Sequence, residues 1–131
     1  MKRFFIIGLA AVFVVALVSL LSLYIIIGSD VKSNIEIAQM RYGGNPEEAL
    51  ISYLEDDSNS CSDRTHLAVW TLGQIRSEKA LSVLMSYYND DPEGVTCFGK
   101  HDQWLCQYEL HKAIEAIENR PLFSFASLKS Q

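Results

Sequence analysis

The sequence predicts an all-α protein, with an N-terminal transmembrane helix followed by a short α-solenoid of helical hairpins. Three observations support this fold class. Residues 4–27 form an uncharged apolar run that is long enough to cross a bilayer. The rest of the chain carries apolar residues at helical spacing. Within that part, EEALISYLEDD resembles EKALSVLMSYYNDD at an offset of 31 residues, a period expected of helical repeats.

The apolar run is predicted to be an uncleaved membrane anchor bounded by Phe4 and Ile27. As a helix it would extend over about 36 Å, and the hydrocarbon core of a bilayer is about 30 Å thick. A cleaved signal peptide is the alternative, but its apolar region normally holds about 7–15 residues and ends at a small residue. Ile26 and Ile27 stand where that small residue would be.

The basic residues that flank the anchor predict its orientation. Residues 1–3 include Lys2 and Arg3, and basic flanks tend to remain in the cytoplasm. The bias is small, because Lys32 and Arg41 follow the run. We therefore expect a single-pass protein of the cytoplasmic (inner) membrane whose C-terminal domain lies on the extracytoplasmic side.

The chain beyond the anchor divides into a polar linker over 28–34, a helical domain over 35–120 and a tail over 121–131. A first helix over 35–42 is expected to end at Gly43-Gly44. The sequence Asn45-Pro46-Glu47-Glu48 predicts the start of the next helix, because asparagine caps a first turn that proline and glutamate favour.

Residues 64–76 and 77–88 predict the central helical hairpin. The first of these helices carries Gly73, which costs about 1 kcal/mol relative to alanine and indicates a closely approaching backbone. A third copy is expected to begin near Asp102 and to stop at Pro121, with the tail either folding over the last helix or frayed. The expected repeat core comprises Ala49, Leu50, Leu54, Ala68, Trp70, Leu72, Gly73, Ile75, Ala80, Leu81, Leu84 and Ile114.

The segment LAVWTLGQIRSEKALSVL resembles a HEAT repeat of the short kind found in phycobilisome-lyase-type bacterial proteins. The family usually carries arginine where Thr65 stands, and Gly-Asp-Pro where Arg76, Ser77 and Glu78 stand. The resemblance implies HEAT-like hairpins and no particular activity. The residues that match are Ala68, Trp70, Leu72, Gly73, Ile75, Ala80, Leu81 and Leu84.

The charge of the domain limits its partners. Two of the 11 basic residues precede Gly28 and none of the 16 acidic ones does, which leaves a formal net charge of −7 for the rest of the chain. Nucleic acid and anionic lipid head groups both require a basic face, so neither is expected as a partner. We expect the membrane and an unidentified protein instead.

Cysteine and histidine residues offer two kinds of site. Cys97, His101, Cys106 and His111 carry zinc-type ligands, but Cys106 and His111 fall on different sides of one predicted helix. A Cys97–Cys106 disulfide is favoured for an exported domain, and Cys61–Cys97 is the alternative pair.

No catalytic constellation or cofactor motif is recognisable. The favoured hypothesis is therefore a membrane-tethered interaction or scaffold module that is not an enzyme, and the alternative is a metal-binding or thiol-dependent protein. Trp70 and Trp104 are expected in the core, with the rim of a binding groove as the alternative place for them.

The anchor hypothesis predicts that residues 4–27 are retained in the mature protein. Mass spectrometry of the chain from the membrane fraction measures this directly. A mature N-terminus near Ser29 would show that the run is a cleaved signal peptide.

Overall fold

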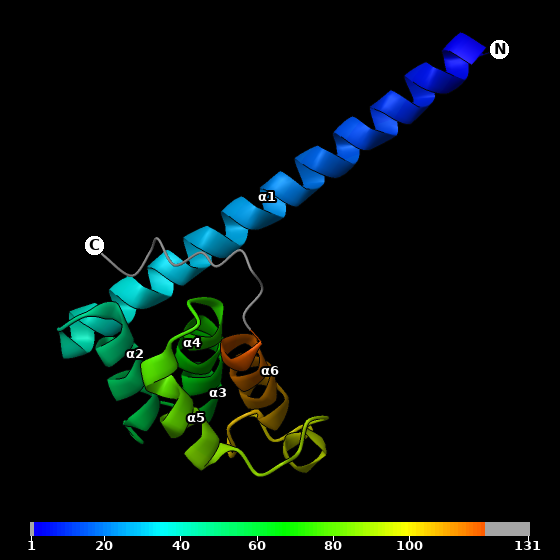
Figure 1. Cartoon of the computed structure of the whole chain (residues 1–131). Coiled ribbons are helices and arrows are strands. Elements are labelled where there is room, and N and C mark those ends of the chain that lie inside the picture. Colours follow the sequence, from blue (N-terminus) through cyan, green and yellow to red (C-terminus); the bar gives the residue numbers. More distant parts are fainter. Residues whose placement is uncertain (1, 120–131) are drawn as a thin grey trace. The chain divides into compact units, whose positions relative to one another are not determined.

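The computed structural model describes residues 2–119, with side chains from residue 7 onward, and every regular element in that range is helical (Figure 1). The chain divides into two compact units, Met1–Lys32 and Ser33–Gln131. The tail predicted over 121–131 lies outside the described residues.

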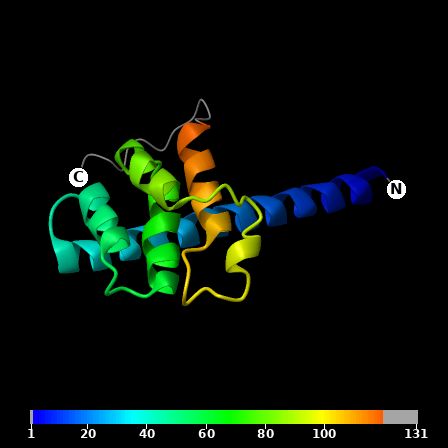
Figure 2. The same ribbon diagram turned by 90° about the horizontal axis from the view of Figure 1, so that it is seen from below.

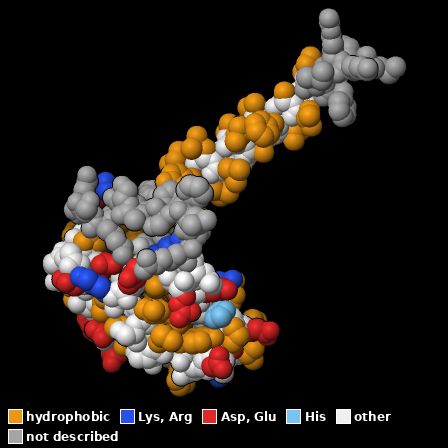
Figure 3. Space-filling view, viewed as in Figure 1, with side chains coloured by type: hydrophobic (Ala, Val, Ile, Leu, Met, Phe, Trp, Pro, Cys, Tyr) orange, Lys and Arg blue, Asp and Glu red, His pale blue; other side chains and the backbone are white. Residues whose placement is uncertain are grey.

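The first unit is the N-terminal part of α1 (Lys2–Tyr42). Its large apolar side chains between Ile7 and Ile27 are 42 to 69 % exposed (Figure 3), which no core helix of a water-soluble unit would be. The hydroxyls of Ser19 and Ser22 donate to the carbonyls of Val15 and Val18, so these polar groups are satisfied without water. This helix is long and apolar enough to cross a membrane.

The linker predicted over 28–34 is helical, because α1 continues without a break to Tyr42. Gly28 is the residue in that stretch with the lowest helix propensity. One glycine costs about 1 kcal/mol, which is too little to end a helix whose next proline is Pro46. The first helix of the domain, predicted over 35–42, is therefore the C-terminal end of α1.

The second unit adds a series of short helices to the end of α1. Asn45 caps α2 (Pro46–Glu55), and its side chain accepts from the backbone N–H of Glu48, as predicted. A continuous helical run follows, made of α3 (Cys61–Asp63), the π-helical η1 (Arg64–Val69) and α4 (Trp70–Gln74). The remaining elements are η2 (Glu78–Ala80), α5 (Leu81–Tyr87), η3 (Val95–Cys97) and α6 (Gln107–Glu118).

These helices stack in an order that follows the chain. The run η1–α4 contacts α2 and α6, and α5 packs against α6, so η1–α4 lies between α2 and α6 (Figures 1 and 2). The helix predicted to begin near Asp102 begins at Gln107. Residues 98–105 form turns instead, in which Gly99 has a left-handed backbone and Trp104 donates to the carbonyl of Lys100.

The core lies between these layers. Of the residues expected there, Ile75 and Leu81 are half-buried and pack against the core. The prediction that Trp70 is buried is wrong, because its side chain is only half-buried. The expected core residues that are buried are Ala49, Leu50, Leu54, Ala68, Leu72, Gly73, Ala80, Leu84 and Ile114.

A buried arginine joins three of the layers. Arg64 donates from Nε to the carbonyl of Leu54 at 2.6 Å and from Nη1 to the carboxylate of Asp57 at 2.7 Å. Its guanidinium also lies over the ring of Tyr87, 5.5 Å from the centroid. A buried charge is tolerated only when it is paired and hydrogen-bonded. Arg64 therefore fixes the end of α2 and the face of α5 against η1.

A second polar cluster holds the end of α1 against the turn after α2. The Tyr42 hydroxyl donates to Asp56 at 2.5 Å and accepts from the amide of Asn59 at 2.9 Å. Asp56 also accepts from the backbone N–H of Ser58. The bond from Tyr42, then those from Ser58, and the charge of Arg41 lower the pKa of Asp56 from 3.8 to about 2.

This cluster predicts a stability that depends on acid pH. The pKa of Asp56 is lower in the folded chain than in the unfolded chain, so its contribution is complete above about pH 4 and is lost as pH falls from 3.8 toward 2. Asp56→Asn should therefore be less stable than the wild type at pH 7, with a smaller difference at pH 2. Urea unfolding at both pH values, followed by tryptophan fluorescence, measures this. A difference that is the same at pH 7 and pH 2 would contradict the assignment.

Candidate functional site: a groove between α4 and α6

The site begins with the unusually close approach of two helices. A Cβ atom built on Gly73 of α4 would lie 2.9 Å from the Cα atom and 3.0 Å from the Cβ atom of Ala113 on α6. Real Cβ atoms essentially never come this close. Glycine is therefore required at this crossing, which explains why the helix accepts its lower propensity.

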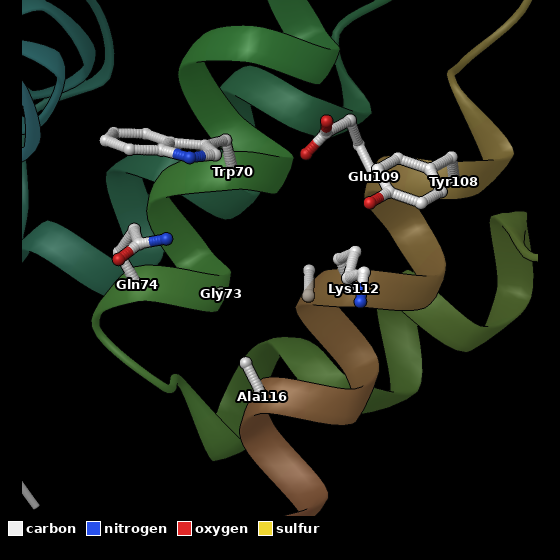
Figure 4. Close-up of a pocket in the computed structure, with 8 residues that line it drawn as sticks. Trp70, Gly73, Gln74, Tyr108, Glu109, Lys112 and Ala116 are labelled. Atoms are coloured by element: carbon white, nitrogen blue, oxygen red, sulfur yellow. The ribbon is translucent and has the colours of Figure 1, made fainter. Parts of the chain in front are cut away.

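Larger side chains surround this contact and leave an open groove of about 270 Å³. Trp70 and Gln74 lie one turn apart on α4, while Tyr108, Glu109 and Lys112 stand on α6 (Figure 4). Ala113 and Ala116 contribute small side chains to the lining. The groove thus has a floor of small residues, aromatic residues on both helices and polar groups at its edge.

A π-helical turn positions Trp70. The N–H of Trp70 donates to the carbonyl of Thr65, five residues earlier. Such wide turns shift the side chains that follow them and occur frequently at functional sites. In the same turn, the Thr65 hydroxyl accepts from the backbone N–H of Cys106 at 3.2 Å. The same turn therefore places Trp70 and anchors the segment that leads into α6.

Tyr108 is positioned by the loop before α6. Gly94 has a left-handed backbone, and a Cβ atom there would lie 3.1 Å from the Cβ atom of Tyr108. The ammonium of Lys112 lies over the Tyr108 ring, 5.7 Å from its centroid. The first two turns of α6 therefore present an aromatic ring and a cation together.

The lining of the groove is chemically mixed. It combines apolar area with a carboxylate, an ammonium and an amide from Glu109, Lys112 and Gln74.

The cysteine and histidine residues do not form the sites considered from sequence. Within residues 7–119, no three His, Cys, Asp or Glu side chains are placed to hold a metal ion. His111 stacks on Tyr88, with 5.8 Å between ring centroids, and His101 is exposed in the turns before α6. The predicted Cys97–Cys106 disulfide is absent, and so is the Cys61–Cys97 alternative, because all three cysteines are free thiols.

Cys97 has a hydrogen-bonding role instead. Its sulfur accepts from the backbone N–H of Gln107 at 3.2 Å and lies 3.3 Å from the carbonyl of Gly94, to which the thiol donates. The neighbouring Cys106 is half-buried. Its burial, together with the nearby Cys97, raises the pKa of the Cys106 thiol. A raised pKa lowers the thiolate fraction, which disfavours nucleophilic chemistry at this position.

Comparison of the chain with protein-family models, with curated proteins and with solved structures finds no match.

Sequence reasoning found part of this site and missed part. Trp70 lines the groove, and Trp104 is exposed in the turn before α6, so neither is in the core. The glycine at position 73 correctly predicted that another backbone approaches the helix closely. Tyr108, Glu109 and Lys112 were missed, although their spacing of three to four residues places Tyr108 and Lys112 on one face of a helix.

The hydrogen bonds of Cys97 predict an order of thiol reactivity. Cys97 is 1 % exposed, so in the folded chain it should react with a thiol reagent much more slowly than Cys61 and Cys106. All three should react after unfolding without a reductant. Mass spectrometry of alkylated peptides measures both steps. Two thiols that stay unreactive in the unfolded, unreduced chain would reveal a disulfide.

Proposed function

We propose that this protein is a membrane-tethered interaction or scaffold module, without catalytic activity of its own, that binds a segment of a partner protein in the groove between α4 and α6. The observation that carries the proposal is the groove itself. It is open, it exposes aromatic residues beside charged ones, and it belongs to a chain whose N-terminal helix is able to cross a membrane.

The layered helices also support a short HEAT-like solenoid as the architecture. Helix α4 ends with Arg76 in the left-handed conformation (φ 52°), and the N–H of Ser77 donates to the carbonyl of Leu72. This is the helix ending that normally uses glycine, and it falls where the HEAT resemblance expects glycine. The backbone thus keeps a glycine-type turn at a position where this sequence has arginine.

The membrane placement belongs to the same proposal. The N-terminal helix acts as an uncleaved single-pass anchor in the cytoplasmic membrane, and the helical unit projects on the extracytoplasmic side. Basic residues before the anchor support this direction. The net negative charge beyond Gly28 favours a protein partner over nucleic acid.

Site-specific photo-crosslinking tests the proposal in intact membranes. A photoreactive amino acid replaces Gln74 at the groove, and in a matched variant it replaces Ser82, which is exposed on α5. We expect a discrete adduct with one protein from position 74 and none from position 82. Adding Trp70→Ala should remove the adduct, because truncating an aromatic anchor typically costs about 2 kcal/mol or more of binding free energy.

Two outcomes would contradict the proposal. Equal adducts from positions 74 and 82 would mean that the groove has no special role. An adduct from position 74 that survives Trp70→Ala in a correctly folded chain would mean that the aromatic wall does not bind the partner.

A further inference from the structure

The segment between α5 and α6 displays large apolar side chains to solvent. Phe98 is 86 % exposed, Val95 is 68 % exposed and Trp104 is 59 % exposed. Outside the N-terminal helix, few large apolar residues of the described chain are as exposed as these. We call residues 94–104 the aromatic loop. Exposed apolar groups gathered on one segment mark interaction surfaces more often than scattered ones do.

The aromatic loop is held in place by its polar and buried residues. The Asp91 carboxylate accepts from the backbone N–H groups of Val95 and Thr96 and from the Thr96 hydroxyl. Cys97, which follows these residues, is buried, and Leu105 closes the loop as part of the core. The frame is therefore anchored, while Val95, Phe98 and Trp104 point outward from it.

The aromatic loop lies at the end of the helical unit that is away from α2. Tyr42 contacts the turn after α2, whereas Asn34, nearer the point where the chain enters the unit, donates to the Thr71 hydroxyl of α4. Following α1 back from Tyr42 therefore leads from the α2 layer to the α4 layer. Within the unit, α6 and the aromatic loop lie at the end away from α2 (Figure 2).

Chain connectivity limits how far Ser33, where the helical unit begins, can be from a bilayer that the anchor spans. Only residues 28–32 separate the predicted end of the anchor from Ser33, and five residues span at most about 17 Å. We propose that the aromatic loop inserts Val95, Phe98 and Trp104 into the interfacial region of the bilayer. This proposal rests on the anchor in the proposed function.

The chemistry of the loop fits a neutral lipid interface. Tryptophan and other aromatic residues favour the boundary between head groups and acyl chains. Between Gly94 and Trp104 the charged residues are Lys100 and Asp102, which cancel formally. Attraction to anionic lipids is therefore not required, and vesicles of zwitterionic phosphatidylcholine should be sufficient.

The experiment uses the full chain reconstituted in phosphatidylcholine vesicles that contain acyl-chain-brominated lipid. Trp70→Phe leaves Trp104 as the sole tryptophan, and Trp104→Phe leaves Trp70 as the matched control. We expect brominated lipid to quench the emission of Trp104 and to leave that of Trp70 unchanged. Adding Val95→Ser and Phe98→Ser to the Trp104 reporter should restore its emission, since both side chains are exposed and their replacement leaves the fold intact.

Flotation of the same vesicles separates the possible failures. If the chain floats with the vesicles but brominated lipid does not quench Trp104, the loop does not enter the bilayer, although the chain is still anchored in it. If the chain does not float, both proposals are contradicted: the membrane anchor and the insertion of the loop. Equal quenching of Trp70 and Trp104 would also overturn the proposal, because contact would then not be specific to the loop.

Discussion

The helical unit depends on the contact between Gly73 and Ala113. Helices packed through ordinary side chains lie 8–10 Å apart, and a glycine facing an alanine allows a closer approach. Here the missing Cβ atom is what admits the backbone of α6. This contact fixes the separation of α4 and α6, and it gives the groove a floor of small residues between aromatic side chains.

Polar side chains set the register of the layers around that contact. Arg64 ties α2 and α5 to η1. Gln107 accepts from the N–H of Asn89 and donates to the carbonyl of Tyr87, so it joins the end of α5 to the start of α6. Apolar packing alone tolerates sliding, whereas buried polar groups are costly unless their partners are in place. The groove and the aromatic loop depend on the same packing, because Gly94 of the loop packs against Tyr108 of the groove.

Local sequence signals predicted the elements better than their connections. The Asn45-Pro46 start was clear because a cap and a first-turn proline act within a few residues. The continuity of α1 through Gly28 was missed, because a polar composition was given more weight than the absence of a helix breaker. The hydrogen-bonding role of Cys97 and the start of α6 at Gln107 depend on contacts across 10 and 41 residues. Helical periodicity contains no information on such contacts.

The unfolding midpoint of Gly73→Ala tests the Gly73–Ala113 contact most directly. Alanine would gain about 1 kcal/mol in helix propensity, but overpacking a close contact typically costs about 1–3 kcal/mol. Gly28→Ala is the matched control, because Gly28 is also helical and nothing lies within 4 Å of an added Cβ atom. Urea titration of each full-length variant in detergent, followed by tryptophan fluorescence, should show a lower midpoint for Gly73→Ala and no decrease for Gly28→Ala. A raised midpoint for Gly73→Ala would show that α4 and α6 do not meet at this contact.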